Sequence, residues 1–121
     1  MVIFQTRVGS FYTIRVGSSY TIISTRARDD ADAAYAWMAE NISPDFAKKW
    51  YQGLFSQIET LTEHPNRCPE SRESPRFSEK IQEIVYGKNR HKHKYRILFT
   101  IREDVVSILY IYHSARKELK P

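Results

Sequence analysis

The chain has 121 residues, of which 41% are hydrophobic and 27% charged, and its net charge is +5. This length suits one domain with one core, and the composition excludes wholesale disorder. The single cysteine, Cys68, cannot form an internal disulfide. Arginines interrupt every apolar run near the N-terminus, so we expect neither a signal peptide nor a membrane span, and we expect a cytoplasmic protein.

The first 22 residues contain a near-identical direct repeat. Residues 7–14 (RVGSFYTI) and 15–22 (RVGSSYTI) differ only at Phe11 and Ser19. Eight residues are too few for a solenoid unit. The second copy leads into a helical pattern, so it is predicted to supply the first strand of a single domain over residues 19–121. Residues 1–18 form an extension, and the pattern leaves open an edge strand, a flexible arm or a passive duplication.

Two amphipathic helices are predicted next. Residues 28–41 begin with acidic side chains, which favour the N-terminal end of a helix dipole. Ser43-Pro44 has the pattern of an N-cap followed by proline at the first helical position, and His64-Pro65 should end the second helix. The two helices should form an antiparallel hairpin. Their predicted apolar faces comprise Ala31, Ala34, Tyr35 and Met38, then Phe46, Trp50, Leu54, Ile58 and Leu61, with Trp37 and Phe55 as further core or hairpin contacts.

Three β-rich runs follow a polar, proline-containing surface loop over residues 64–78. They cover residues 81–87, 94–101 and 105–113, and the last two are joined by a short charged turn, which predicts a β-hairpin. One face of the middle run is apolar, whereas the other begins with Lys94 and Arg96. The expected fold is α+β: an N-terminal strand, an antiparallel two-helix hairpin and a three-stranded antiparallel sheet, with the helices on one side of the sheet.

Charge is distributed unevenly along the chain. Residues 28–63 carry three basic and seven acidic side chains, whereas residues 64–121 carry thirteen basic and seven acidic ones. This asymmetry favours an anionic partner, either nucleic acid, a ribosome surface or an acidic protein, through attraction that salt weakens. Charge alone does not choose among these partners.

Five short motifs occur in order between residues 19 and 117: residues 27–32 (ARDDAD), 43–44 (SP), 61–65 (LTEHP), 95–99 (YRILF) and 111–116 (IYHSAR). In this order they resemble the RelE/ParE superfamily, the toxins of bacterial type II toxin–antitoxin modules. The resemblance implies a small growth-arresting protein without a cofactor, which a cognate antitoxin neutralises by covering its sheet and active face.

Two mechanisms occur among the proteins that the chain resembles. ParE-like members are associated with poisoning DNA gyrase and need no catalytic residues, whereas RelE-like members cut messenger RNA on the ribosome. The long helices joined by residues 41–44 and the acidic first helix resemble the ParE branch, so a gyrase or another topoisomerase is the favoured target. A member that only binds its antitoxin is a third alternative. Leftover apolar residues on the helices would favour contact with the antitoxin or with a second copy in a homodimer.

The nuclease alternative assigns specific residues. Arg96 and Arg116 would stabilise the phosphate, and His113 would transfer a proton. RelE-like members commonly place a tyrosine after their C-terminal arginine, whereas this chain continues with Lys117 and ends at Pro121. His113, His91 or Tyr112 would therefore have to accept the proton.

The remaining basic residues are predicted to contact an anionic target or partner: Lys88, Arg90, Lys92, Lys94 and Lys117. His91 and His93 alternate as two ligands on one side of a strand would, but no cysteine or carboxylate lies near them in the sequence. Two ligands make a weak site, so no metal is expected.

Overall fold

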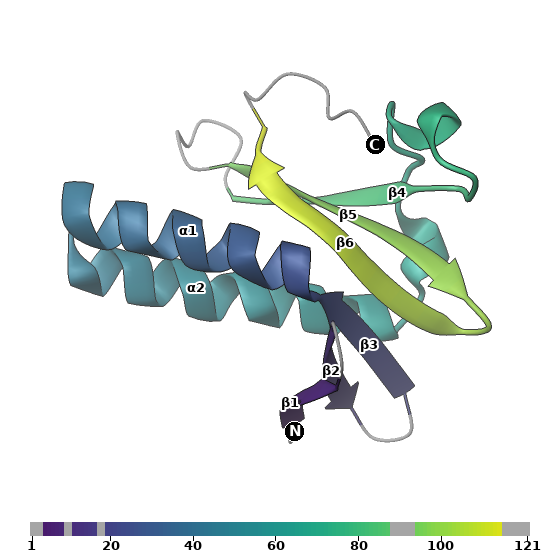
Figure 1. The fold of residues 1–121 in the computed structure, drawn as a ribbon, viewed down its shortest axis with the longest axis horizontal. Helices are drawn as coiled ribbons and strands as arrows, with labels where there is room; N and C mark the ends of the chain where they lie inside the picture. Colours follow the sequence, from purple (N-terminus) through teal and green to yellow (C-terminus); the bar gives the residue numbers. More distant parts are fainter. Residues whose placement is uncertain (1–3, 9–10, 17–18, 88–93, 115–121) are drawn as a thin grey trace.

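The computed structural model describes residues 4–8, 11–16, 19–87 and 94–114, which form one six-stranded sheet and a pair of long helices (Figure 1). The strand order is β1-β2-β3-β6-β5-β4, and every neighbouring pair is antiparallel except β3 and β6. The elements are β1 Phe4–Val8, β2 Phe11–Val16, β3 Ser19–Ser24, α1 Thr25–Asn41, α2 Pro44–Glu59, β4 Gln82–Tyr86, β5 Tyr95–Arg102 and β6 Val105–His113.

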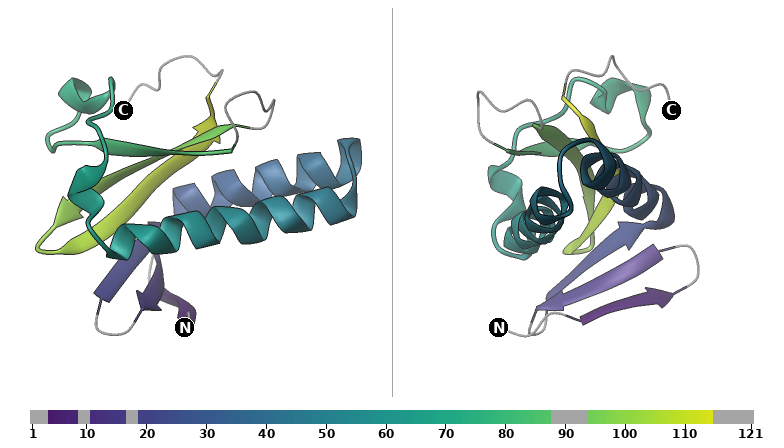
Figure 2. Two further views of the ribbon diagram at one scale, coloured as in Figure 1. Left: turned by 180° about the vertical axis from the view of Figure 1, so that it is seen from behind. Right: turned by 90° about the vertical axis from the view of Figure 1, so that its left-hand side faces the viewer.

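The predicted α+β fold is confirmed. Strand β3 leads into the α1–α2 hairpin, and β4, β5 and β6 then form the antiparallel part of the sheet, with the helices on one side (Figures 1 and 2). The β5–β6 hairpin turns at Glu103 and Asp104, whose φ angles are 48° and 66°. A two-residue turn with two positive φ angles matches the right-handed twist of the strands. Strands β1 and β2 extend the sheet beyond the predicted domain.

Helix α1 begins three residues earlier than predicted. The Ser24 hydroxyl accepts a hydrogen bond from the Ala27 N–H at 3.0 Å and donates to the Leu109 carbonyl at 3.1 Å. The first turn therefore contains no acidic residue, and the predicted dipole role of the opening carboxylates is wrong. The Asp30 carboxylate instead accepts the Ile111 N–H at 3.1 Å. It thereby satisfies a backbone donor of β6 beyond the point where β3 stops pairing.

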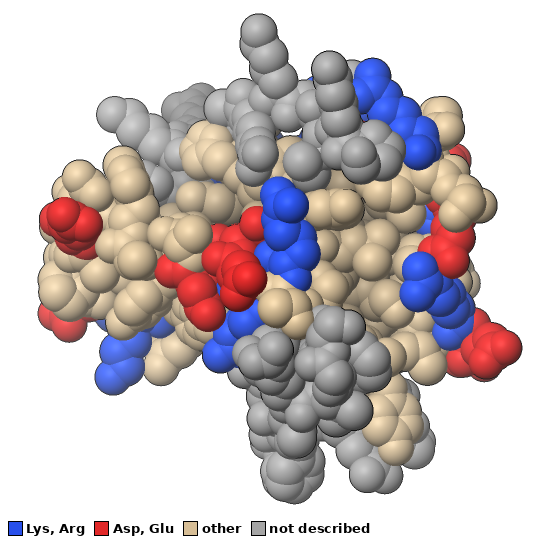
Figure 3. Space-filling model, viewed as in Figure 1, with Lys and Arg blue, Asp and Glu red and all other residues tan. Residues whose placement is uncertain are grey.

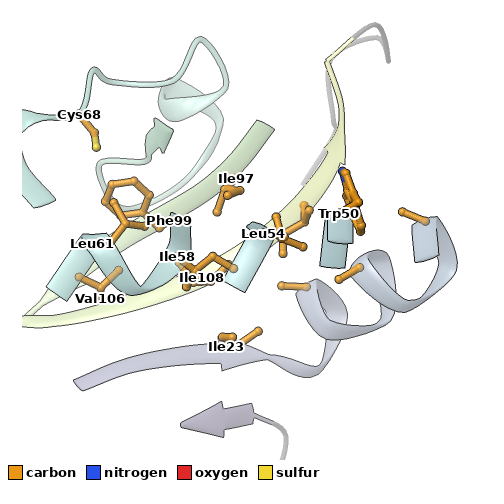
Figure 4. Close-up of a cluster of buried hydrophobic side chains, with 14 of the residues drawn as sticks. Ile23, Trp50, Leu54, Ile58, Leu61, Cys68, Ile97, Phe99, Val106 and Ile108 are labelled. Carbon is orange, nitrogen blue, oxygen red and sulfur yellow. The ribbon is translucent and has the colours of Figure 1, made fainter. Parts of the chain in front are cut away.

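The main core lies between the helices and the sheet (Figure 4). The predicted stripe is confirmed for Trp50, Leu54 and Ile58 of α2 and for Leu61 in the 3-10 turn that follows, all buried, whereas Phe46 is half-buried. Helix α1 contributes mainly small residues, which let its backbone approach the sheet closely. On α1, Tyr35 is 36% exposed but contacts Tyr51 of α2, as expected of the hairpin, whereas Trp37 is 53% exposed and does not belong to the core. Neither helix is long and apolar enough to cross a membrane.

The predicted surface loop is the largest correction. The loop is in contact with both faces of the sheet: Cys68 is buried in the main core, whereas residues 73–80 lie on the opposite face and close a second, smaller core. This core surrounds Ile81, Leu98 and Tyr112, with Phe77, Leu109 and Tyr110 half-buried against it. The loop also follows the outer edge of β4, because the Ser71 N–H donates to the Ile81 carbonyl at 2.8 Å. Polar composition misled the prediction, since the loop is held by polar bonds to distant residues.

Gly53 allows a close contact between α2 and the sheet. The Tyr86 hydroxyl of β4 donates to the Trp50 carbonyl at 2.9 Å, and a Cβ atom at position 53 would lie 2.1 Å from that hydroxyl oxygen. The tyrosine ring can therefore reach the helix backbone only because residue 53 has no side chain.

We expect Gly53→Ala to destabilise the fold by about 1–2 kcal/mol, although this change in an ordinary helix stabilises by about 1 kcal/mol. The added methyl group must displace Tyr86 and break its hydrogen bond. Urea unfolding measures the effect. In a Tyr86→Phe background the same glycine substitution should be much less harmful, because the clashing oxygen is gone. A stabilising effect of Gly53→Ala in the natural chain would contradict this account.

Candidate functional site

Arg96 lies in a buried polar cluster on the loop side of the sheet. Its side chain on β5 is held between Glu73 of the loop and Glu83 of β4, and the residue is only 5% exposed. Its guanidinium donates to both oxygens of Glu73 at 2.8 and 2.6 Å, and to both oxygens of Glu83 at 3.2 and 2.6 Å. A fifth bond, at 2.8 Å, goes to the Tyr112 hydroxyl.

The electrostatics of this cluster favour its charged form. Burial alone would raise the pKa of Glu73, but hydrogen bonds from Arg96, Ser71 and Tyr112 lower it well below its usual value. Burial alone would lower the pKa of Arg96, but its bonds to the two carboxylates raise it. Burial and the bond to Glu73 both raise the pKa of Tyr112. At neutral pH Glu73 is therefore a carboxylate, Arg96 a guanidinium and Tyr112 a neutral phenol.

This arrangement leaves Arg96 unsuited to the predicted role of phosphate ligand. A guanidinium has five N–H donors, and the five bonds to Glu73, Glu83 and Tyr112 use all of them. Arg72 also lies 3.7 Å from Glu73, so two guanidiniums balance the two carboxylates and the cluster offers no excess positive charge to a phosphate. Tyr112, one of the predicted substitutes for a proton acceptor, is itself a buried member of this cluster.

The structure does not bring Arg96 and His113 together. Arg96 pairs directly with Tyr112, and Tyr95 pairs directly with His113, so Arg96 and His113 point to opposite faces of the sheet. The His113 ring lies edge-on to Tyr95, with centroids 5.3 Å apart, and Tyr95 in turn packs against Trp50 of α2. His113 thus belongs to the helix side of the sheet.

The other predicted site residues are mostly beyond the described ranges. Lys94 is half-buried ahead of β5, and its carbonyl accepts the Ser114 N–H at 2.9 Å. The remaining predicted contacts lie outside the described residues: Lys88, Arg90, His91, Lys92, His93, Arg116 and Lys117. Their binding of an anionic target stays a prediction. Within the described residues, no group of three or more potential ligands could hold a metal ion.

An apolar groove of about 290 Å³ lies on the loop side of the sheet. A β-bulge creates its floor: Leu98 pairs with Tyr110 but Phe99 pairs with Ile108, which leaves Leu109 unpaired. Leu109 and Tyr110 therefore both line the groove, together with Phe77 and Ile81. Arginines stand at its rim, Arg26 bonded to Asp30 at 2.9 Å and Arg102 to Glu79 at 2.8 Å. Figure 3 shows uncharged surface between basic side chains in this view.

The α1–α2 hairpin presents a second apolar surface, because it projects beyond the sheet (Figures 1 and 2). Near its far end Trp37 is 53% exposed and Ile42 is 42% exposed. Between the helices, Tyr51 contacts both Tyr35 and Phe55, with ring centroids 5.3 and 4.9 Å apart. We call the exposed apolar residues Trp37 and Ile42 the hairpin patch; Tyr35 lies about 200° around α1 from Trp37 and packs on Tyr51 instead. Large exposed apolar side chains are candidates for protein contact.

We expect Arg96→Met to lower the free energy of unfolding by about 3–5 kcal/mol, because it leaves the Glu73 carboxylate buried without its cation. Arg102→Met is the matched control. Its ion pair with Glu79 is exposed and screened by solvent, so its loss should cost far less than the loss of Arg96. Urea unfolding of both variants at pH 7 measures the difference, and equal losses would show that the buried cluster is not a major source of stability.

The cluster should also make stability sensitive to acid. The pKa of Glu73 is lower in the folded chain than in the unfolded chain, where it is about 4.3. Its stabilising effect is therefore complete above that unfolded value and is lost as the pH falls toward the folded value. We expect the stability advantage of the natural chain over Glu73→Gln to shrink by about 1–2 kcal/mol between pH 7 and pH 3. A constant difference in unfolding free energy would contradict the assigned shift.

Comparison with known proteins identifies the family. The sequence profile described as "ParE toxin of type II toxin-antitoxin system, parDE" matches residues 21–118. A solved structure described as "Chromosomal ParDE TA system from P. aeruginosa" contains a chain with the same fold, with 22% sequence identity and a TM-score of 0.58. That match covers 75% of this chain and 90% of the other. No curated protein sequence matches the chain. Because the profile spans both helices and strands β4 to β6, this chain belongs to the ParE toxin family of type II toxin–antitoxin systems.

Proposed function

We propose that this toxin inhibits DNA gyrase by binding to it in the cytoplasm, without chemistry of its own, and that a cognate antitoxin neutralises it. Membership of the ParE family supports a toxin–antitoxin role. Arg96 is the main reason for proposing binding and not catalysis. All five of its N–H donors are bonded within the protein, so none is left for a phosphate. The position of His113 on the other face of the sheet supports the same choice.

The hairpin patch is the proposed contact with gyrase. Trp37 and Ile42 lie near the end of the hairpin, where the sheet does not cover them, and tryptophan is among the residues that most often dominate binding energy. Helix α1 carries four acidic side chains, Asp29, Asp30, Asp32 and Glu40, and two basic ones, Arg26 and Arg28, so its net charge is −2. An excess of negative charge repels nucleic acid, so the patch is suited to the protein part of a gyrase–DNA complex.

The groove on the loop side is the proposed contact with the antitoxin. Its floor is apolar and its rim carries Arg26 and Arg102, on a chain whose net charge is +5. An acidic antitoxin could place an apolar side chain against Leu109 and Tyr110 while its carboxylates lie near the rim arginines. A separate site for each partner would let the antitoxin bind before gyrase is released.

The purified protein should inhibit supercoiling of relaxed plasmid by gyrase, and prior mixing with its antitoxin should restore supercoiling. Trp37→Ala should raise the half-inhibitory concentration about tenfold or more, the effect of losing about 1.4 kcal/mol of contact. Val85→Thr is the control, since Val85 is an exposed apolar residue on β4, outside the hairpin. It should inhibit as the natural chain does, and circular dichroism should show that both variants are folded.

The alternatives give different results in parallel assays. Cleavage of ribosome-bound messenger RNA, abolished by His113→Ala, together with unaffected gyrase, would establish the nuclease and refute the proposal. Activity in neither assay, without growth arrest on expression, would leave a protein that only binds its antitoxin. Inhibition of gyrase that is equally strong with Trp37→Ala would keep the target but move the contact away from the hairpin patch.

A further inference from the structure

The repeated N-terminal sequence lies largely outside the region that matches the family, which begins at residue 21. The second half of the first copy forms most of β2, and the second half of the second copy forms most of β3. The two strands are antiparallel neighbours, and β2 pairs with β3 over the whole of its length. The extra copy is thus bonded to the outer edge of its own near-duplicate.

Two residues just after the repeat decide which copy lies beside β6. Ile23 is completely buried in the main core, and Ser24 caps α1. The equivalent positions after the first copy are Arg15 and Val16. An arginine in place of Ile23 would bury an unpaired charge, and a valine in place of Ser24 could not accept the Ala27 N–H. Only the second copy fits beside β6, so the first copy is left to pair with the second.

Because β2 and β3 carry copies of the same repeat, their pairing indicates how two β3 strands from different molecules would pair. Thr13 lies opposite Ile22 and Ile14 lies opposite Thr21. In the repeat, Thr13 and Ile14 are the equivalents of Thr21 and Ile22. Two β3 strands in this register would place Thr21 of each opposite Ile22 of the other, related by a two-fold axis between the strands. This is the self-complementary geometry of a symmetric dimer.

We propose that the β1–β2 hairpin is an edge cap within the chain, and that it blocks a site on β3 which would otherwise pair with β3 of a second copy. An uncovered strand edge is a template for pairing, and β3 contains three consecutive β-branched residues that favour strands, Thr21, Ile22 and Ile23.

The opposite edge of the sheet is protected in a comparable way. The Glu83 N–H of β4 donates to the Pro69 carbonyl at 3.0 Å, so a segment of the loop occupies part of that edge. Strand β1, which becomes the outer strand on the capped side, has only five residues and includes Gln5, Thr6 and Arg7. Short strands with polar and charged residues are poor templates for further pairing.

The test opens the cap in the full-length chain. The double substitution Thr13→Pro, Ile14→Pro removes two successive backbone N–H donors of β2. Because successive N–H groups point to opposite edges of a strand, one of the two is directed toward β3. Sedimentation equilibrium should give the monomer mass for the natural chain and twice that mass for the double-proline variant. The matched control is Gln5→Pro with Thr6→Pro, which disrupts β1 but leaves β2 on β3. It should remain a monomer.

A further substitution tests the proposed register. Adding Ile22→Lys to the Thr13→Pro, Ile14→Pro chain places two lysines beside the two-fold axis, so the dimer should return to monomer. A double-proline variant that is monomeric with natural helical circular dichroism would overturn the proposal. So would a dimeric natural chain, or a dimer that survives Ile22→Lys. Loss of helical signal would show that the hairpin is required for folding and is not a cap. None of these outcomes depends on gyrase.

Discussion

The buried bonds of Arg96 fasten the loop to the sheet and link three neighbouring strands. They join β5 to β4 through Glu83, to β6 through Tyr112 and to the loop through Glu73. The loop around Glu73 is polar, so apolar burial alone would not hold it on the sheet. Once it is held there, Phe77 can close the second core and form a wall of the groove. The second face of the sheet therefore depends on one satisfied guanidinium.

That dependence explains why a residue with the sequence pattern of a catalytic cation has a structural role. A lone arginine on the polar face of a strand is expected to be exposed, and an exposed arginine can bind phosphate. Here the loop returns from the end of α2 and supplies a carboxylate that is completely buried. Two carboxylates then satisfy the cation more completely than a transient ligand could. Burial raises the energy of any state in which one partner leaves, so the cluster stays closed.

Local patterns predicted the parts of the fold that local physics determines. The stripe on α2, the Ser43-Pro44 start and the β5–β6 hairpin are confirmed because each depends on residues close in sequence. The missed features depend on distant partners. Glu73 meets Arg96 across 23 positions, Tyr86 meets the backbone at Trp50 across 36, and the bulge at Leu109 has no local signature. Exposure of Trp37 was missed because helical spacing does not show where the sheet ends.

Within the described residues, other parts of the chain already cover much of the sheet, and this coverage determines which surfaces stay open to a partner. The helices cover one face of the sheet and the loop covers much of the other. Residues 69–71 follow part of the β4 edge, and β2 covers the outer edge of β3. Addition of a partner strand is therefore disfavoured at β3 and along part of β4. The hairpin patch and the groove are two apolar surfaces that remain open among the described residues, and both include side chains held on helices or strands. Binding through such preformed surfaces loses little conformational entropy, so either surface could bind a partner tightly without refolding.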